Sequence, residues 1–187
     1  MKTRSRALPA GWYPEGAEET ISLLDSWRDG LEREREADGV SVVVPHAGWY
    51  FSGELAFKTM ALLDRSVETV VVVGGHLPPK ALLTCYGEDA GETPMGPIAQ
   101  DTEVLAALDA EFRVQTDETP DNTVEVQLPM VKYLFSDAKY VGLRVSPTAL
   151  AIDVGASLRR LVNEGKKRIA VVGSTDLTHY GAAYGFA

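Results

Sequence analysis

Three short runs rich in valine and isoleucine constrain the fold of this chain more than any other sequence feature. They span residues 40–44, 70–73 and 169–172, and none shows the regular polar–apolar alternation of a half-buried strand. Runs of this kind are typical of strands buried on both faces, as in a parallel sheet covered by helices. The sequence therefore predicts an α/β fold built on a central, largely parallel sheet.

Helix-type and strand-type segments alternate along most of the chain, which supports the same fold class. Ala17, Ile21, Leu24, Trp27 and Leu31 recur at steps of three and four residues and indicate one helix face. The other predicted helices span residues 54–63 (capped by Ser52), 101–108 (capped by Asp101), 124–135 (disturbed by Pro129) and 149–162. The other predicted strands span residues 81–86, 112–114 and 140–145. The predicted architecture is a mostly parallel or mixed central sheet with helices on both faces.

All three histidines of the chain follow one of the apolar runs. The first two runs and the helix between them form a βαβ unit, whose right-handed crossover makes both strands point the same way. We therefore expect His46 and His76 at the same edge of adjacent or near-adjacent strands. His179 follows the third run. Ligands of open α/β sheets bind outside the carboxyl ends of the strands, so this placement predicts a metal or catalytic centre.

The chemistry of these residues supports that prediction. Neutral imidazole is a common ligand of iron, copper and zinc, and His46 with His76 form the predicted metal pair. Asp176 lies three residues before His179, where its carboxylate could orient the imidazole or add a ligand. His179 suits acid–base work because the unperturbed pKa of histidine is about 6.5. The alternative is structural: Asp176 caps a helix and His179 packs against it.

Composition narrows the class of protein. At 187 residues and 45% hydrophobic content the chain can bury the core of a single domain spanning residues 1–187. The net charge of −9, with no basic stripe, argues against nucleic-acid or anionic membrane partners. No apolar run approaches the roughly 20 residues that cross a bilayer. Cys85 is the only cysteine and is predicted to be a buried apolar residue; a cytoplasmic location is expected.

For several residues the sequence allows more than one structural role. The charged run at residues 32–36 is interpreted as a solvated face. Residues 49–51 are three consecutive aromatics, so some are expected in the core and one as a wall of the site. Glu125 and Gln127 could reach the site or face solvent. No dinucleotide fingerprint or serine-hydrolase elbow is present in the sequence.

Two segments carry a resemblance to a known family. Residues 45–53 (Pro-His-Ala-Gly-Trp-Tyr-Phe-Ser-Gly) and 174–181 (Ser-Thr-Asp-Leu-Thr-His-Tyr-Gly) resemble the MEMO family, also called protein B of the AmmeMemoRadiSam system. Residues 11–14, 93–96 and 124–129 are similar to further motifs of that family, in the same order. The resemblance therefore covers nearly the whole chain.

The resemblance implies a fold similar to class III extradiol dioxygenases, the non-haem iron enzymes that open catechol rings. It implies that His46 and His76 are metal ligands, and that Asp176 and His179 lie beside the metal or act as acid–base groups. The implied cofactor is a metal ion, iron first, with copper or zinc as alternatives. The eukaryotic member has also been discussed as a phosphopeptide-binding adaptor, so the implied partner is a small molecule or a peptide.

Three departures from the family pattern bear on these expectations. The family's remaining ligand is a cysteine downstream of the Thr-His-Tyr-Gly loop, so the chain is expected to lack the family's C-terminal part, and Cys85 lies in the wrong segment to replace it. Residues 122–123 are Asn-Thr where the family often has His-Ser. Residues 74–76 are Gly-Gly-His in place of Gly-Pro-x-His, which should keep the imidazole in position.

Two functions from different classes remain open at the level of sequence. The first is a metal-binding protein with O₂-dependent or redox chemistry, in which Asp176 is the best additional ligand within the chain. The second is a non-catalytic module that captures a small molecule or peptide in the same pocket. The sequence leaves turnover, metal identity and oligomeric state undecided.

Overall fold

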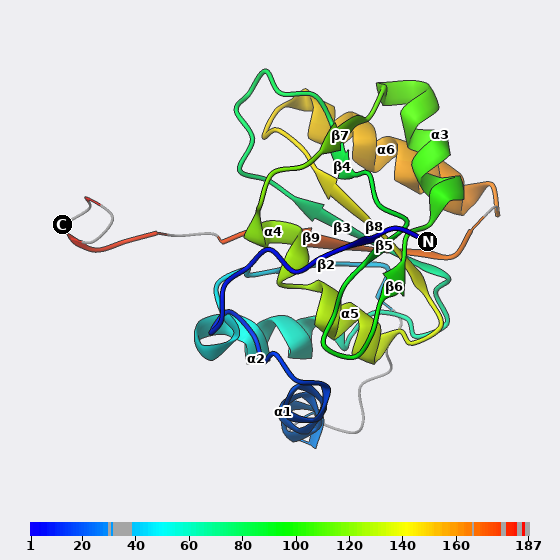
Figure 1. The fold of residues 1–187 in the computed structure, drawn as a ribbon. Helices are drawn as coiled ribbons and strands as arrows, with labels where there is room; N and C mark the ends of the chain where they lie inside the picture. The colour runs from blue at the N-terminus through cyan, green and yellow to red at the C-terminus, as the bar shows by residue number, and fades with distance from the viewer. Residues whose placement is uncertain (30, 32–38, 166, 177–178, 183–184, 186–187) are drawn as a thin grey trace.

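A six-stranded mixed sheet forms the centre of the molecule in the computed structural model, which describes residues 1–29, 31, 39–165, 167–176, 179–182 and 185 (Figure 1). Its strands, in spatial order, are β2 (Ser41–Val44), β9 (Ile169–Ser174), β3 (Thr69–Gly74), β8 (Lys139–Arg144), β4 (Thr84–Tyr86) and β7 (Gln115–Asp117). A smaller three-stranded sheet contains β1 (Thr3–Arg4), β5 (Ala90–Gly91) and β6 (Ile98–Ala99).

Strand pairing in the large sheet is parallel except at one position. β2, β9, β3 and β8 run parallel to one another, whereas β4 pairs with β8 in the antiparallel sense. β7 is again parallel to β4. The predicted mixed, mostly parallel sheet is therefore confirmed, and β9 from the end of the chain is inserted between β2 and β3.

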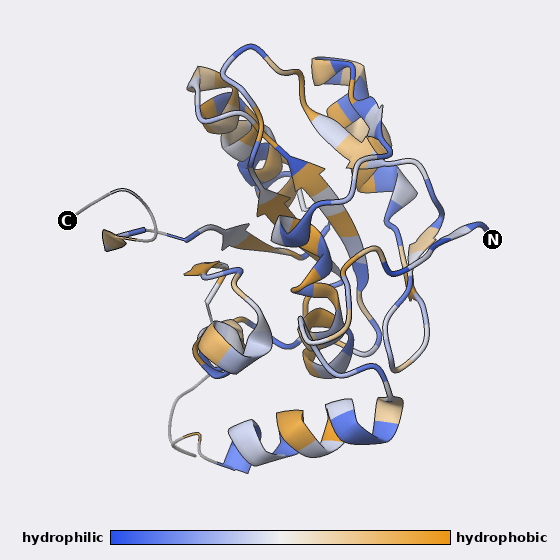
Figure 2. Cartoon of the chain, turned by 60° about the vertical axis from the view of Figure 1, so that its left-hand side comes forward, coloured by the Kyte–Doolittle hydropathy of each residue, from blue (hydrophilic) through white to orange (hydrophobic). Residues whose placement is uncertain are grey.

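Helices cover both faces of the sheet, as the sequence predicted (Figure 1). One layer contains α1 (Ala17–Asp29), α2 (Trp49–Met60), α4 (Asn122–Glu125) and α5 (Leu128–Leu134), and the other contains α3 (Thr102–Phe112) and α6 (Ala149–Asn163). In β3, Val70 and Val72 pack in the first layer and Val71 in the second. Both faces are apolar, which explains the unbroken valine run and the apolar colour of the central strands (Figure 2).

Two predicted helices have different boundaries in the structure. The helix predicted at 54–63 begins at Trp49, and its N-cap is Gly48 rather than Ser52. Burial of the Trp49 ring against α1 favours the earlier start. The helix predicted at 124–135 is divided into α4 and α5, because Pro129 lies in the first turn of α5, where a proline without an N–H is tolerated.

The remaining elements confirm most of the sequence predictions. The strands expected at 140–145 and 168–172 are β8 and β9. The Asp101 carboxylate caps α3 by accepting hydrogen bonds from the Glu103 and Val104 amides. The strand predicted at 112–114 is displaced to β7, because α3 continues through Phe112. The charged run at 32–36 lies outside the described residues. No helix in the described parts of the chain is long and apolar enough to cross a bilayer.

Candidate functional site

The predicted site residues meet at the carboxyl ends of three neighbouring strands. His46 follows β2, Asp176 and His179 follow β9, and His76 follows β3, in the spatial order β2–β9–β3. The rings of His46 and His76 meet edge to face with their centres 5.0 Å apart. Segments separated by 130 residues in sequence therefore meet here, and the segment after β9 supplies Asp176, which contacts His46.

Asp176 connects two of the three imidazoles. Its Oδ1 accepts a hydrogen bond from the His46 backbone N–H at 2.9 Å, and its Oδ2 lies 3.7 Å from His46 Nε2. The same Oδ2 lies 3.3 Å from Nε2 of His179. Its Oδ1 therefore holds the loop after β2. The helical turn considered for residues 176–179 includes residues 177–178, which lie outside the described part of the chain.

His76 has a conformation that is unusual for a residue with a side chain. Its φ of 59° lies in the left-handed region, which few non-glycine residues adopt and which is frequent at functional sites. Its Nδ1 lies 3.0 Å from Asp121 Oδ2, and half of the imidazole remains exposed. Asp121 thus contacts Nδ1 of the His76 ring, and Nε2 lies on the opposite side of the ring from this contact.

Arg144, at the end of β8, is the buried cation that holds the His76 loop. Its Nη1 contacts Asp117 Oδ2 at 2.7 Å, and its Nη2 lies 3.4 Å from Asp121 Oδ2. Its Nε donates to the Gly75 carbonyl oxygen at 3.0 Å. One guanidinium therefore connects two carboxylates and the backbone that precedes His76.

The surroundings of these groups determine their charge. Burial lowers the pKa of His46 below its usual value, although nearby Asp176 acts in the opposite direction, so this imidazole is neutral near pH 7. Burial alone would raise the pKa of Asp176. The hydrogen bond from the His46 amide and the adjacent imidazoles outweigh that effect and lower the pKa of Asp176, which is therefore a carboxylate. A neutral imidazole beside a carboxylate is the form that binds metal ions.

Polar side chains from α4 and the segment after it hold the strand ends in place. Asn122 Nδ2 donates to the His46 carbonyl oxygen at 2.9 Å. Gln127 is buried, and its Nε2 donates to the Pro45 carbonyl oxygen at 2.9 Å and to Ser174 Oγ at 3.1 Å. Gln127 therefore ties β2 to β9 directly beneath the site.

Glu125 neither lines the site nor faces solvent. Its buried carboxylate accepts hydrogen bonds from the backbone N–H groups of Ala7 and Leu8, at 2.9–3.1 Å. It also accepts the Tyr13 hydroxyl at 3.2 Å. Glu125 thus fastens the N-terminal segment, which reaches the site through Trp12.

A cavity of about 770 Å³ opens over the histidines. It is lined by Ala10, Gly11, Trp12, His46, Ala47, Gly48, Phe51, His76, Asn122, Asp176 and His179. The prediction for the three consecutive aromatics is confirmed: Trp49 is buried in the core, whereas exposed Phe51 forms part of this wall. Cys85 is buried in β4, as predicted, outside this cavity.

The donor set can be compared with what a metal ion requires. Two imidazoles bound to one ion at the usual N–metal distance of about 2.1 Å bring their ring centres to roughly 5 Å. The His46–His76 pair has this separation, and His46 Nδ1 is buried without a hydrogen bond to any described residue. Among the residues that the structure describes, no group of three or more His, Cys, Asp or Glu side chains is arranged to hold an ion. The two imidazoles could therefore supply two nitrogen ligands to one metal ion.

Sequence reasoning missed Asp121 and Arg144. Asp121 belongs to the polar segment 116–122, which was interpreted only as a loop. Arg144 stands in the otherwise apolar stretch 140–145, and a charged residue in a buried strand is itself a signal, since such a residue needs a partner.

Comparison with known proteins gives consistent matches over nearly the whole chain. A family model described as Memo-like protein matches residues 4–187. A MEMO1 family protein of Thermococcus onnurineus is 32% identical, over 98% of this chain and 67% of the relative. MEMO1 family proteins of Methanosarcina acetivorans and Methanococcoides burtonii are 33% and 35% identical, over 98% and 95% of this chain and 70% and 68% of their own lengths.

Proposed function

The chain belongs to the family of Memo-like proteins, and from this premise we propose that it binds a transition-metal ion between His46 and His76. The observation that carries the proposal is the 5.0 Å approach of these two rings at the ends of β2 and β3. Iron is the first candidate and copper or zinc are the alternatives, because all three accept neutral imidazole ligands. Burial lowers the pKa of His46 and keeps this ligand deprotonated near neutral pH.

The remaining residues would position ligands and move protons. A bound ion of this type supplies Lewis-acid or redox chemistry, including activation of O₂ when the ion is iron or copper. Asp176 holds His179 through Nε2 at 3.3 Å, which favours one tautomer of that imidazole. His179 then takes or gives a proton at the cavity mouth. Asp121 orients His76 in the same way through Nδ1.

A second function uses the same cavity without turnover. Its volume of about 770 Å³ lies within the range of small-molecule sites, roughly 300–1,000 Å³. Trp12 and Phe51 give it an apolar wall beside the polar histidine end. A module that binds a small molecule or a peptide would need these features and no reaction.

Metal content after anaerobic reconstitution with iron, copper or zinc tests the metal proposal. We expect close to one ion per chain in the parent protein and little in the His46→Ala/His76→Ala double variant. His179→Ala is the matched control, because it also removes an imidazole from the cavity but should retain the ion. Equal metal content in the parent and the double variant would refute the proposal.

Oxygen consumption separates the two functions. The metal-loaded parent would be tested with a panel of catechols, with His179→Ala for comparison. Consumption by the parent that His179→Ala abolishes, with metal retained, supports chemistry at this site. Binding of a catechol without consumption of oxygen supports the second function.

A further inference from the structure

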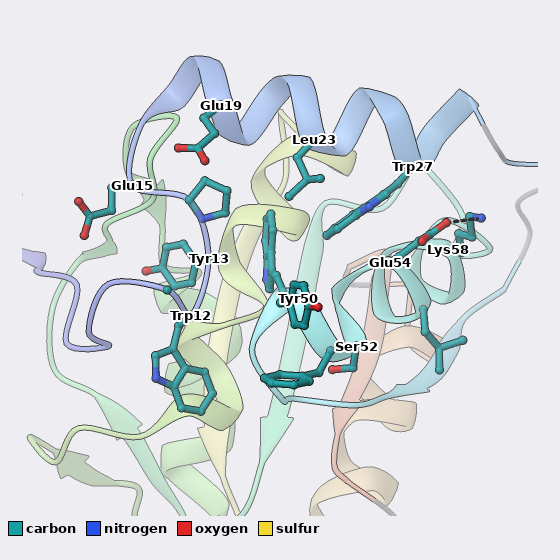
Figure 3. Close-up of a pocket in the computed structure, with 15 residues that line it drawn as sticks. Trp12, Tyr13, Glu15, Glu19, Leu23, Trp27, Tyr50, Ser52, Glu54 and Lys58 are labelled. Atoms are coloured by element: carbon teal, nitrogen blue, oxygen red, sulfur yellow. Dashed lines mark ion pairs between the residues drawn. The ribbon is translucent and has the colours of Figure 1, made fainter.

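A second cavity lies beside the histidine cavity, between α1 and α2 (Figure 3). It has a volume of about 800 Å³, and we call it the α1–α2 groove. Its lining residues are Gly11, Trp12, Tyr13, Pro14, Glu15, Glu19, Leu23, Trp27, Trp49, Tyr50, Phe51, Ser52, Glu54, Leu55 and Lys58. Gly11, Trp12 and Phe51 line both cavities, so the two lie side by side.

The first turns of α2 present large apolar side chains on this groove. Tyr50 is 90% exposed and Phe51 80% exposed, and their rings meet edge to face with centres 5.2 Å apart. Leu55, one turn later, is also exposed. Large apolar side chains gathered at one exposed place are a mark of binding surfaces.

Rings in the core support this exposed layer. Trp49 is buried, and its indole Nε1 donates to the Val126 carbonyl oxygen at 3.0 Å. The Trp49 ring lies 5.3 Å from that of Trp27 and 5.9 Å from that of Tyr13. The base of the groove is therefore held by packed core rings, so a ligand would not have to order this part.

The charges of the lining residues determine which sign of charge a ligand can carry. Glu15 and Glu19 lie at one end of the groove, Glu54 and Lys58 lie at the other, and Tyr50 lies between them (Figure 3). Lys58 is the single basic residue of the described lining, and Glu54 Oε1 neutralises it at 2.7 Å. Glu15 and Glu19 are exposed carboxylates, and within the described residues the ion pairs include one for Glu15, with Arg6 Nη1 at 4.0 Å, and none for Glu19.

The groove therefore carries an excess of negative charge next to exposed aromatic faces. An anionic group placed here would be repelled, whereas an ammonium or guanidinium group would be attracted by the carboxylates and by the ring faces. The net charge of −9 for the whole chain acts in the same direction.

We propose that the α1–α2 groove binds an extended peptide segment of a partner protein that carries a lysine or arginine side chain flanked by apolar residues. The basic side chain lies over Tyr50 and directs its charge toward Glu15 and Glu19. The apolar neighbours pack on Phe51 and Leu55. A peptide segment fits this lining, because neighbouring residues of one chain can supply the basic group for the carboxylates and the apolar groups for the exposed rings. This site goes beyond the metal proposal and does not depend on it.

Selection from a phage library of random heptapeptides tests the proposal. The selection uses the metal-free parent chain in a chelating buffer, and phage that bind the Tyr50→Ala/Phe51→Ala double variant are removed. We expect the retained sequences to be enriched in lysine or arginine beside apolar residues and depleted of aspartate and glutamate. Enrichment of acidic or uncharged sequences, or no enrichment over the double variant, overturns the proposal.

Calorimetry with a synthetic copy of the most enriched peptide then tests the carboxylates. The Glu15→Gln/Glu19→Gln variant should bind this peptide about tenfold more weakly and with a smaller dependence on salt, because two attractive charges are lost. Glu118→Gln/Asp153→Asn is the matched control: it removes the same charge from exposed positions outside the groove and should lose far less affinity. Equal losses in the two variants would contradict the assigned site.

Both variants alter only exposed side chains, so circular dichroism and the melting temperature should match those of the parent. Because the chelator removes metal, a failed selection leaves the metal proposal standing, and an empty metal site leaves this proposal standing.

Discussion

Replacing Arg144 by methionine should remove a large share of the stability of this protein. Arg144→Met keeps a side chain of comparable length but deletes the guanidinium that contacts Asp117, Asp121 and the Gly75 carbonyl. The Arg144 and Asp117 side chains are 8% and 5% exposed, so water cannot replace the lost contacts without opening the structure. Two carboxylates would remain buried beside an apolar side chain.

The magnitude follows from that burial. Removing one partner of a buried ion pair costs about 3–5 kcal/mol, because the other charge is left uncompensated. The free energy of unfolding of a domain is about 5–15 kcal/mol in total, so this loss is a substantial fraction of it. In a chain of this size, each kcal/mol of lost stability lowers the melting temperature by about 2–4 °C. The loss expected for Arg144→Met therefore lowers it by roughly 6–20 °C.

Urea unfolding followed by tryptophan fluorescence measures the loss, with Arg160→Met as the matched control. Arg160 also makes a close ion pair, 2.6 Å from Glu111 Oε2, but both side chains are largely exposed. Exposed pairs contribute about 0–1 kcal/mol, so the control should be nearly as stable as the parent. If the two variants lost the same stability, the reasoning from burial would be wrong.

Three further predictions follow from buried contacts elsewhere. Burial alone would raise the pKa of Asp117, but hydrogen bonds and the adjacent Arg144 guanidinium outweigh it and lower this pKa. The contribution of the carboxylate to stability is therefore present above pH about 4 and is lost as the pH falls below that value. The urea midpoint of Asp117→Asn should change less between pH 6 and pH 3 than that of the parent. Gly74→Ala should destabilise the protein by about 1–3 kcal/mol in thermal melts, because the added Cβ would lie 2.7 Å from the Thr123 Cβ. Gly155→Ala, in an open position of α6, is the control and should be neutral or stabilising. Glu125→Ala leaves the Ala7 and Leu8 amides without their acceptor, and hydrogen exchange at these amides should accelerate while exchange in β3 stays slow; unchanged exchange at the two amides would contradict the assigned role of the carboxylate.

The local pattern of the sequence determined the secondary structure of the sheet and the edge at which the histidines lie. An unbroken valine run must be buried on both faces, so β3 could be recognised without knowledge of its neighbours. The right-handed crossover then fixed the direction of β2 relative to β3, and with it the common edge of His46 and His76. These inferences needed only periodicity and chain handedness, which are properties of short segments.

Helix boundaries and the partners of the histidines depended on contacts between distant segments. Helix α2 begins at Trp49 because that ring is buried against α1, and no pattern within α2 itself records this contact. Asp121 lies 45 residues from His76 in sequence and meets it through the left-handed turn after β3.

Tertiary structure alone decided which strand lies between β2 and β3, and which aromatic rings remain exposed. The insertion of β9 brings Asp176 into contact with His46 and His179. It follows from pairing between strands that lie 100 or more residues apart in sequence. Trp49, Tyr50 and Phe51 have similar side chains, yet one is in the core and two face water. Their positions around the axis of α2 and the packing of α1 against it decide the difference, so the groove became visible only in the folded chain.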